Sequence, residues 1–252
     1  MNFYAISSLL AVIICISLGI FVYLQGTRKI LNQTFSLTSI LIGLWCLFPF
    51  LTYIAPTDEK ALLYGRLTYI AAVFTPSAFF HFVFVMIEID KRKIEKDIIR
   101  SFYLISILFL AALFNPNFIK GIIRRFPYSA VIPGILYPVF ILFFGILCPY
   151  AIYQIFITSH HATGYRKNQL KYLFLGFFIA LGGGILHLAA AYIHKEPIPH
   201  DLLLITWAGI TTYAIVKHHL LDINIVLTRA GIFALVYFPI VFIPFWIASK
   251  LI

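Results

Sequence analysis

The chain alternates long apolar runs with short polar segments along almost its whole length. A membrane crossing needs about 20 predominantly apolar residues, and most of the runs reach or approach that length. The run at Ser101–Phe114 is shorter, but Ile98 and Ile99 extend it if Arg100 reaches toward the lipid headgroups. We therefore expect an all-α, polytopic transmembrane helix bundle of seven spans, followed by an eighth apolar helix. The expected spans are Phe3–Leu24, Thr34–Ile54, Leu67–Ile87, Ser101–Phe114, Ile135–Ile157, Tyr172–Ile193, Leu202–Val216 and Gly231–Ile252.

The longest connection between the expected spans is the segment Asn115–Gly134. Pro116, Pro127 and Pro133 lie within it, and proline removes a backbone hydrogen-bond donor. We expect an irregular loop here.

Composition points to the same class. Hydrophobic residues make up 62% of the chain and charged residues 11%, whereas soluble domains carry about a quarter charged residues. The net charge of +10 comes from basic residues in short loops, so we expect membrane lipids as partners and no nucleic acid. Cys15, Cys46 and Cys148 lie inside apolar runs without CxxC or CxxH spacing, which is typical of reduced core thiols.

The distribution of Lys and Arg predicts the orientation. With the N-terminus outside, the inner loops hold 12 of these residues and the outer loops hold 7. The segment Lys91–Arg100 contributes most to the difference, and positively charged loops face the cytoplasm. We expect a multi-pass protein of the inner (plasma) membrane, with Lys217–Arg229 in the cytoplasm.

No HExxH, GxSxG, Walker or paired-carboxylate motif occurs in the sequence. The histidine pairs at His160 and His218 have no third ligand nearby and suit interfacial helix ends. His81 and His187 lie at depths that differ by roughly 12 Å along their helices, which disfavours a haem held between them. We therefore expect neither an enzyme activity nor a cofactor or metal site.

Four residues within or at the ends of the spans are candidates for a ligand pocket. Arg66 begins the third span on the outer side, where a guanidinium can bind a carboxylate, a phosphate or a carbonyl. His81, His187 and Trp207 complete the candidate set. The alternative is structural: Arg66 anchors its helix at the interface, and the histidines form hydrogen bonds within the bundle.

The segment Leu202–Arg229 is a candidate for signal transmission. Its first part is an apolar helix, and a basic, mildly amphipathic tract follows without a Gly or Pro break. Lys217, Asp222 and Arg229 are the candidate residues in this tract. We expect the helix to continue past Val216, so that a rigid connection moves the tract. The alternative is an ordinary short loop between two spans.

Several patterns along the chain carry a resemblance to a known family. The patterns are Asn32, Phe35 and Trp45 in the second span, R-x-x-Y-I-A-A…P…F-F-H-F from Arg66, R-K-N-Q-L-K-Y at Arg166–Tyr172, the run Gly182–Gly184, and Y-A-I-V-K-H-H-L-L-D-I-N-I-V from Tyr213. Together they resemble the N-terminal seven-transmembrane sensor region of bacterial histidine kinases and related signalling proteins, over about residues 5–227.

The resemblance implies a division of the chain and a function. Residues 1–229 are expected to be a seven-transmembrane input domain, and residues 230–252 an additional transmembrane segment that begins a missing or truncated C-terminal region. After Arg229 we find no phosphoacceptor His box, ATP-binding Gly-rich segment or cyclic-dinucleotide synthase motif. We therefore expect a membrane sensor of the two-component type without its own catalytic output.

The interpretation as a membrane sensor implies several partners, and alternative functions remain open. The expected partners are a small or lipidic signal, a cytoplasmic kinase or output domain, and a second copy of the chain. The chain is either a fragment of a longer kinase or a stand-alone membrane module. The first alternative function is a small multi-pass permease, although we find no internal repeat or paired broken helices. The second alternative function is a membrane enzyme.

Overall fold

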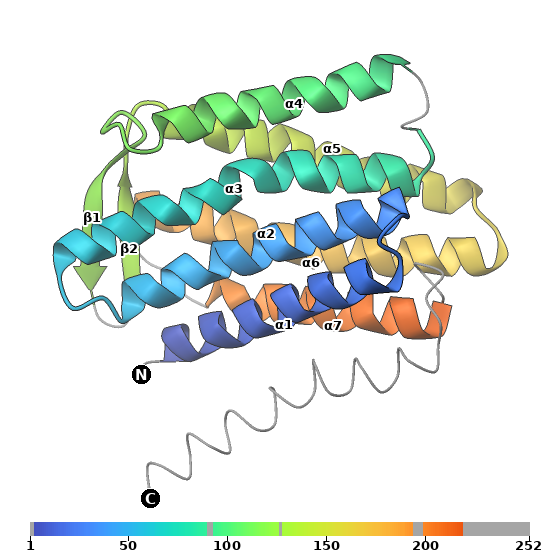
Figure 1. The fold of residues 1–252 in the computed structure, drawn as a ribbon, viewed down its shortest axis with the longest axis horizontal. Coiled ribbons are helices and arrows are strands. Elements are labelled where there is room, and N and C mark those ends of the chain that lie inside the picture. The colour runs from blue at the N-terminus through green and yellow to red at the C-terminus, as the bar shows by residue number, and fades with distance from the viewer. Residues whose placement is uncertain (1–2, 90–92, 126–127, 194–198, 219–252) are drawn as a thin grey trace, which may run out of the picture.

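A computed structural model describes residues 3–89, 93–125, 128–193 and 199–218. In these residues the chain forms seven helices and one two-stranded sheet, and the helices lie side by side in alternating directions (Figure 1). The predicted eighth span, Gly231–Ile252, lies outside the described residues. The elements are α1 (Phe3–Gln25), α2 (Ile30–Tyr53), α3 (Asp58–Met86), α4 (Lys93–Ala112), β1 (Ile119–Arg125), β2 (Tyr128–Pro133), α5 (Tyr137–His161), α6 (Gly164–Ile193) and α7 (His200–His218).

Five of the described helices are long and apolar enough to cross a membrane: α1, α2, α3, α5 and α6. This confirms the predicted helical fold class and makes the chain a multi-pass membrane protein. The first turns of α4 are charged over Lys93–Arg100, and α7 carries Asp201 and Lys217 near its two ends, so neither reaches the same apolar length. Membrane crossing by α4 and α7 stays a prediction.

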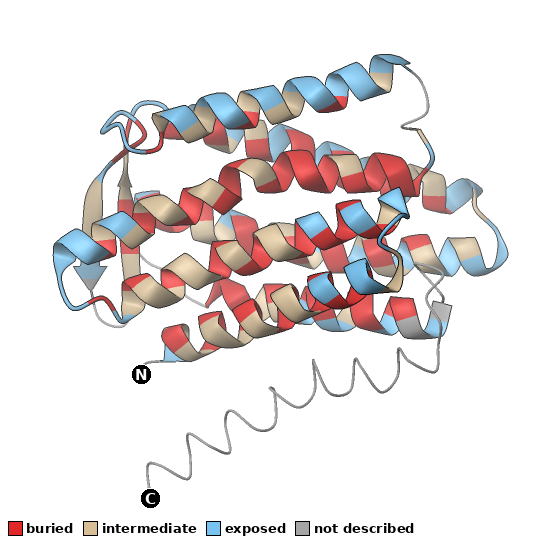
Figure 2. Cartoon of the chain, in the orientation of Figure 1, coloured by how far each residue is buried: buried red, intermediate tan, exposed pale blue. Residues whose placement is uncertain are grey.

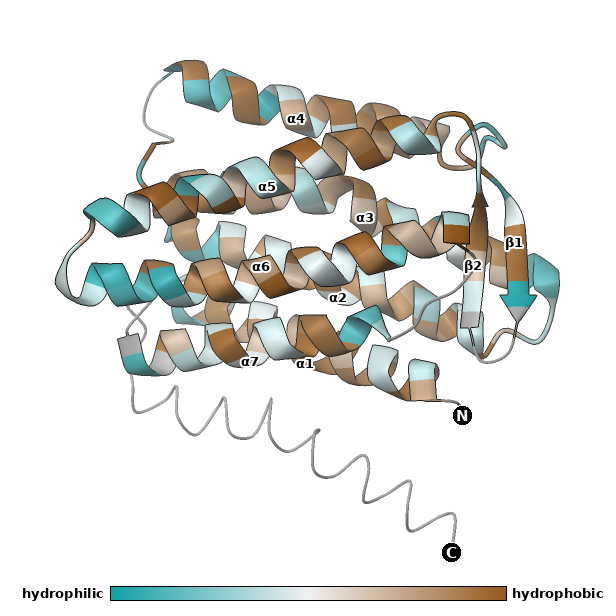
Figure 3. Cartoon of the chain, turned by 180° about the vertical axis from the view of Figure 1, so that it is seen from behind, coloured by the Kyte–Doolittle hydropathy of each residue, from teal (hydrophilic) through white to brown (hydrophobic). Residues whose placement is uncertain are grey.

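The helix α3 runs through the centre of the bundle. Most of its length is buried, whereas α4 buries only Ile99 and Ser106 among its residues (Figure 2). Leu104 and Leu108 on α4 are exposed apolar side chains, as expected for a helix that faces lipid. Apolar residues cover the middle of α5 and α6, and polar residues gather toward their shared loop (Figure 3).

The start of α3 shows why the structure extends the predicted third span. The helix begins at Asp58 rather than near Leu67. The side chain of Thr57 accepts a hydrogen bond from the backbone N–H of Lys60 (3.3 Å), which is a favourable N-cap. Asp58 in the first turn interacts favourably with the helix dipole. The polar turn is therefore helical although it adds nothing to the apolar run.

The other end of α3 closes with a Schellman motif. The backbone N–H of Ile89 donates to the carbonyl of Phe84 (3.0 Å), and that of Glu88 donates to Val85 (3.2 Å). Glu88 has a φ of 62°, the left-handed conformation that glycine usually supplies at this position. A glutamate there costs backbone strain that glycine would not.

The segment Asn115–Gly134 differs from the irregular loop that we expected. It contains an antiparallel hairpin of β1 and β2, with Arg125 opposite Tyr128 and a register shift between Ile119 and Gly121. The prolines do not prevent this pairing because Pro116 precedes β1 and Pro133 is the last residue of β2, positions where strands tolerate proline. The hairpin covers the end of the bundle at which α1 begins (Figure 1).

Candidate functional site

A cluster of buried polar side chains lies at the hairpin end of the bundle, where α7 begins. Asp201 and His200 occupy the first turn of α7 and are 0% and 1% exposed. A carboxylate oxygen of Asp201 lies 3.3 Å from Nε2 of His200, and the other accepts a hydrogen bond from the Ser8 hydroxyl of α1 (2.5 Å). Burying a carboxylate is costly unless it is paired and hydrogen-bonded, so these two contacts stabilise the arrangement.

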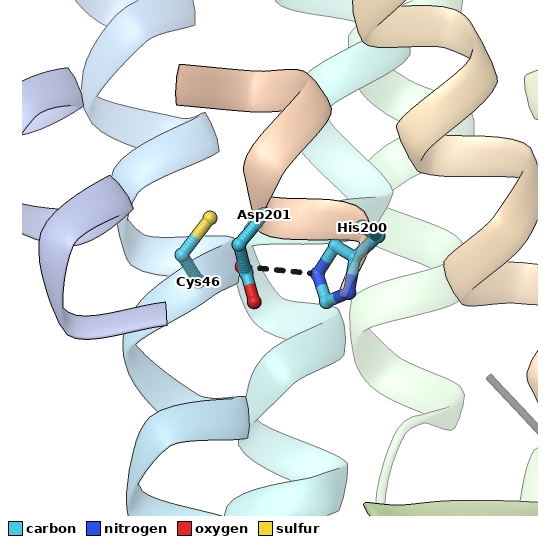
Figure 4. Close-up of side chains that lie close together, drawn as sticks. All are labelled: Cys46, His200 and Asp201. Atoms are coloured by element: carbon cyan, nitrogen blue, oxygen red, sulfur yellow. Dashed lines mark ion pairs between the residues drawn. The ribbon is translucent and has the colours of Figure 1, made fainter. Parts of the chain in front are cut away.

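The cluster extends to α2 and α6. The thiol of Cys46 on α2 faces Asp201 and His200, and the ligand atoms of these three residues lie within 4.8 Å of one another (Figure 4). The ring of His187 on α6 lies 4.3 Å from the ring of His200. We call Ser8, Cys46, His187, His200 and Asp201 the polar cluster. Its five residues come from four helices that are distant in sequence.

His187 connects the polar cluster to a second buried network. Its ring contacts Trp45 (5.6 Å) and Tyr69 (6.5 Å). The hydroxyls of Tyr69 and Tyr137 lie 2.6 Å apart, and Tyr137 also donates to the carbonyl of Leu188 (3.4 Å). These contacts join α3, α5 and α6 beside the cluster.

A small cavity lies between this network and the hairpin. It has a volume of about 30 Å³, which is space for about one water molecule, and its lining includes Gly65, Tyr69, Val131 and His187. The hairpin residue Val131 therefore faces the same space as His187. Of the polar cluster, only His187 lines this cavity.

Arg66 lies beside this cavity and holds the hairpin. Its guanidinium donates to the backbone carbonyl of Ile119 at the start of β1 (3.2 Å). A second arginine, Arg124 of β1, pairs with Asp58 (3.0 Å) and donates to the carbonyl of Ala55 (2.7 Å). The position of Arg66 agrees with the structural alternative, an anchor, here for the hairpin.

The other two predicted pocket residues lie elsewhere. Nδ1 of His81 on α3 is 3.3 Å from the hydroxyl of Tyr103 on α4. Trp207 is fully buried on α7 between Phe35 and Phe177, and it packs near Gly176. Gly176 is about 16 Å along α6 from His187, at about 1.5 Å per residue. The four candidates therefore do not form one pocket.

A larger groove lies in the opposite half of the bundle, between α3, α4 and α5. It has a volume of about 360 Å³, and its lining includes Phe80, Phe84, Phe102, Tyr150 and Glu95. The lining contains none of the four predicted pocket residues. Its apolar and aromatic walls suit an acyl chain better than a charged ligand.

The candidate signal-transmission residues are described only in part. Lys217 lies near the end of α7, with its ammonium 5.5 Å from the centre of the Tyr213 ring. A hydrogen bond with the Tyr213 hydroxyl raises the pKa of Lys217. The described part of the helix reaches His218, two residues past Val216, and its continuation through the tract stays a prediction. Asp222 and Arg229 lie outside the described residues.

Sequence reasoning did not identify the polar cluster. It treated Cys46 as a core thiol and started the seventh span at Leu202, which left His200 and Asp201 in a loop. The available signal was the acid at the start of an apolar helix, where the helix dipole favours a carboxylate. The proximity of Cys46 to Asp201 depends on the packing of α2 against α7 and has no local signal.

Comparison with known proteins identifies the family. A family model described as the N-terminal 7TM region of histidine kinase matches residues 7–224. The match covers a sensor region and not a catalytic core. Searches of the curated proteins and of the solved structures found no match. Because the match covers most of the chain and includes every residue of the polar cluster, the chain belongs to the family of N-terminal seven-transmembrane regions of histidine kinases.

Proposed function

We propose that this chain is the membrane-embedded input module of a two-component-type signalling protein of the bacterial plasma membrane. The family match supports a membrane sensor. In the proposed orientation the N-terminus and the hairpin face outward, and Lys217 lies on the cytoplasmic side, as the distribution of Lys and Arg favours. Catalysis is assigned to a cytoplasmic kinase or output domain that receives the signal from this chain.

The proposal rests mainly on the position of α7, which extends from the polar cluster to Lys217. The helix begins with His200 and Asp201 in the polar cluster, and its described part reaches His218, next to Lys217. At about 1.5 Å per residue these two ends are about 27 Å apart, which is close to the thickness of the hydrocarbon core. One helix therefore joins the buried polar cluster on the proposed outer side to Lys217 on the proposed inner side.

The surroundings of α7 favour movement as a unit. Trp207, Ala208 and Ala214 are buried against neighbouring helices, so the middle of α7 has close packing partners on α6 and α1. The side of α6 that faces α7 includes Gly176 and Gly183, and small residues let helices approach closely. A shift of 1–2 Å at such an interface is a common switching movement.

A distance measurement between the cytoplasmic helix ends tests the proposal. Spin labels are placed at Lys167 on α6 and Lys217 on α7, both exposed, in the full chain in lipid nanodiscs. Asp201→Asn removes the charge at the start of α7 and keeps the side-chain shape. We expect the distance distribution to shift by about 2 Å.

The matched control is Asp97→Asn, which removes an exposed acid on α4. The chain without introduced cysteines is treated with the same spin label to measure any signal from the three native cysteines, which are all buried. Asp97→Asn should leave the distribution unchanged. An unchanged distribution in Asp201→Asn as well would contradict the proposed transmission through α7.

A further inference from the structure

We propose that Cys46, His200 and Asp201 bind a divalent transition-metal ion of the Zn²⁺ class. The three side chains offer a sulfur, an imidazole nitrogen and a carboxylate oxygen from α2 and α7, all buried (Figure 4). This inference does not depend on the proposed sensor function, because it concerns binding alone.

The distances fit one small ion. Ligand atoms at about 2.0–2.3 Å from a tetrahedral ion are about 3.3–3.8 Å from one another. Nε2 of His200 and the carboxylate oxygen of Asp201 are 3.3 Å apart, and all three ligand atoms lie within 4.8 Å of one another. A movement of the Cys46 sulfur by about 1 Å toward the other two ligand atoms brings all three separations into this range.

The types of ligand decide the class of ion. A thiolate and an imidazole are ligands that Zn²⁺ and related ions prefer, whereas Ca²⁺ and Mg²⁺ need several oxygens. Among the three, only Asp201 supplies oxygen. The ring of His187 lies 4.3 Å from that of His200, but its nitrogens are not among the ligand atoms that lie within 4.8 Å of one another, so these three side chains leave the fourth position of a tetrahedral ion open. The set is therefore of the Cys, His and Asp type that holds zinc.

Charge balance favours the bound state in a buried site. The Asp201 carboxylate and the Cys46 thiolate together carry two negative charges, which one divalent ion neutralises. On binding, the thiol proton leaves to solvent, as does any proton on the His200 nitrogen that binds the ion. The hydrogen bond from Ser8 to the second carboxylate oxygen orients Asp201 toward the ion, as supporting groups do in metal sites.

Cobalt spectroscopy on the full chain in detergent tests the proposal. Co²⁺ occupies zinc sites, and a bound thiolate gives a charge-transfer band in the near ultraviolet. We expect about one equivalent of Co²⁺ to produce this band and Zn²⁺ to displace it. Cys46→Ser should abolish the band, and His200→Gln or Asp201→Asn should weaken binding more than about 100-fold, since loss of a supporting group alone costs about 10–100-fold.

Two matched variants control for general effects. Cys148→Ser removes another buried cysteine, and His81→Gln removes another histidine of the bundle; both should keep the band and the affinity. His160 and His161 are exposed neighbours and form the competing site. Binding that survives Cys46→Ser but is lost in His160→Gln would overturn the proposal.

A measurement without variants covers the case in which a substitution unfolds the chain. X-ray absorption of the zinc-loaded wild-type chain reports the ligand atoms directly. We expect one sulfur together with nitrogen and oxygen ligands. An environment without sulfur, or no stoichiometric binding, would overturn the proposal and leave the input role of α7 untouched.

Discussion

Two aspartates at opposite ends of the bundle lie in opposite environments. At the hairpin end, Asp201 is fully buried and contacts Ser8 and His200. At the opposite end, Asp97 and Arg100 pair on the exposed surface of α4, with side chains 52% and 75% exposed. A buried carboxylate needs its partners, whereas an exposed pair contributes little. The difference concerns burial and not the end of the bundle, because Asp58 at the hairpin end is also exposed (83%) and pairs with Arg124.

The largest expected effect concerns the two aspartates of this comparison. Asp201→Asn should lower the free energy of unfolding by about 3 kcal/mol, because it breaks a buried pair. Asp97→Asn should change it by about 0.5 kcal/mol or less, because its partner remains solvated. Thermal unfolding in detergent measures both. Equal effects would show that the buried contacts of Asp201 are not energetically distinct.

The hydroxyl that bonds Asp201 gives the next largest effect, with its neighbour as control. Ser8→Ala removes a buried hydrogen bond to a carboxylate and should cost about 2 kcal/mol. Ser7 is also buried, but its hydroxyl bonds the carbonyl of Tyr4 in the same helix (2.9 Å). Ser7→Ala should cost less than about 1 kcal/mol. If Ser7→Ala costs as much in the same unfolding assay, burial of a hydroxyl and not the carboxylate contact sets the energy.

Arg66 sharpens the comparison at the surface of the hairpin end. Arg66→Ala removes the bond to the Ile119 carbonyl and should cost about 1.5 kcal/mol, mainly as faster amide exchange in β1 and β2. Arg100→Ala, which removes only an exposed pair, is the control and should change exchange by little. Exchange that is unchanged in the hairpin of Arg66→Ala would return Arg66 to the ligand-pocket interpretation.

The smallest effect is a gain in stability at the end far from the hairpin. Glu88→Gly places glycine at the left-handed position of the Schellman motif and should stabilise the chain by about 1 kcal/mol. Glu88→Ala keeps the strained backbone and should give no such gain. A loss of stability in Glu88→Gly would show that contacts of the Glu88 side chain outweigh the backbone strain.

The sequence predicted the helices well and their tertiary partners poorly. The first span was expected at Phe3–Leu24 and is Phe3–Gln25. The two agree because nearly the whole helix is apolar, so the apolar run and the helix have almost the same ends. α6 begins at Gly164 rather than Tyr172, because hydropathy reports only the part of a helix that is apolar. The hairpin was missed because prolines at strand ends look the same in sequence as prolines in a loop.

The candidate site was predicted less well for a physical reason. His187 was identified because a histidine within an apolar run is unusual. His200 and Asp201 stand at a boundary between polar and apolar segments, where polar residues are ordinary. Their significance comes from burial by α1, α2 and α6, and that requires the helix order and rotation, which a single sequence does not determine.

In the proposed function, α7 transmits a change in the polar cluster to the opposite end of the bundle. Hydrogen–deuterium exchange of wild type and Asp201→Asn, in nanodiscs, tests it most directly at residues 209–218 of α7. We predict altered exchange along this whole segment, with no change at the neighbouring end of α5 near His161. A change confined to the first turn of α7, around His200 and Asp201, would contradict the claim.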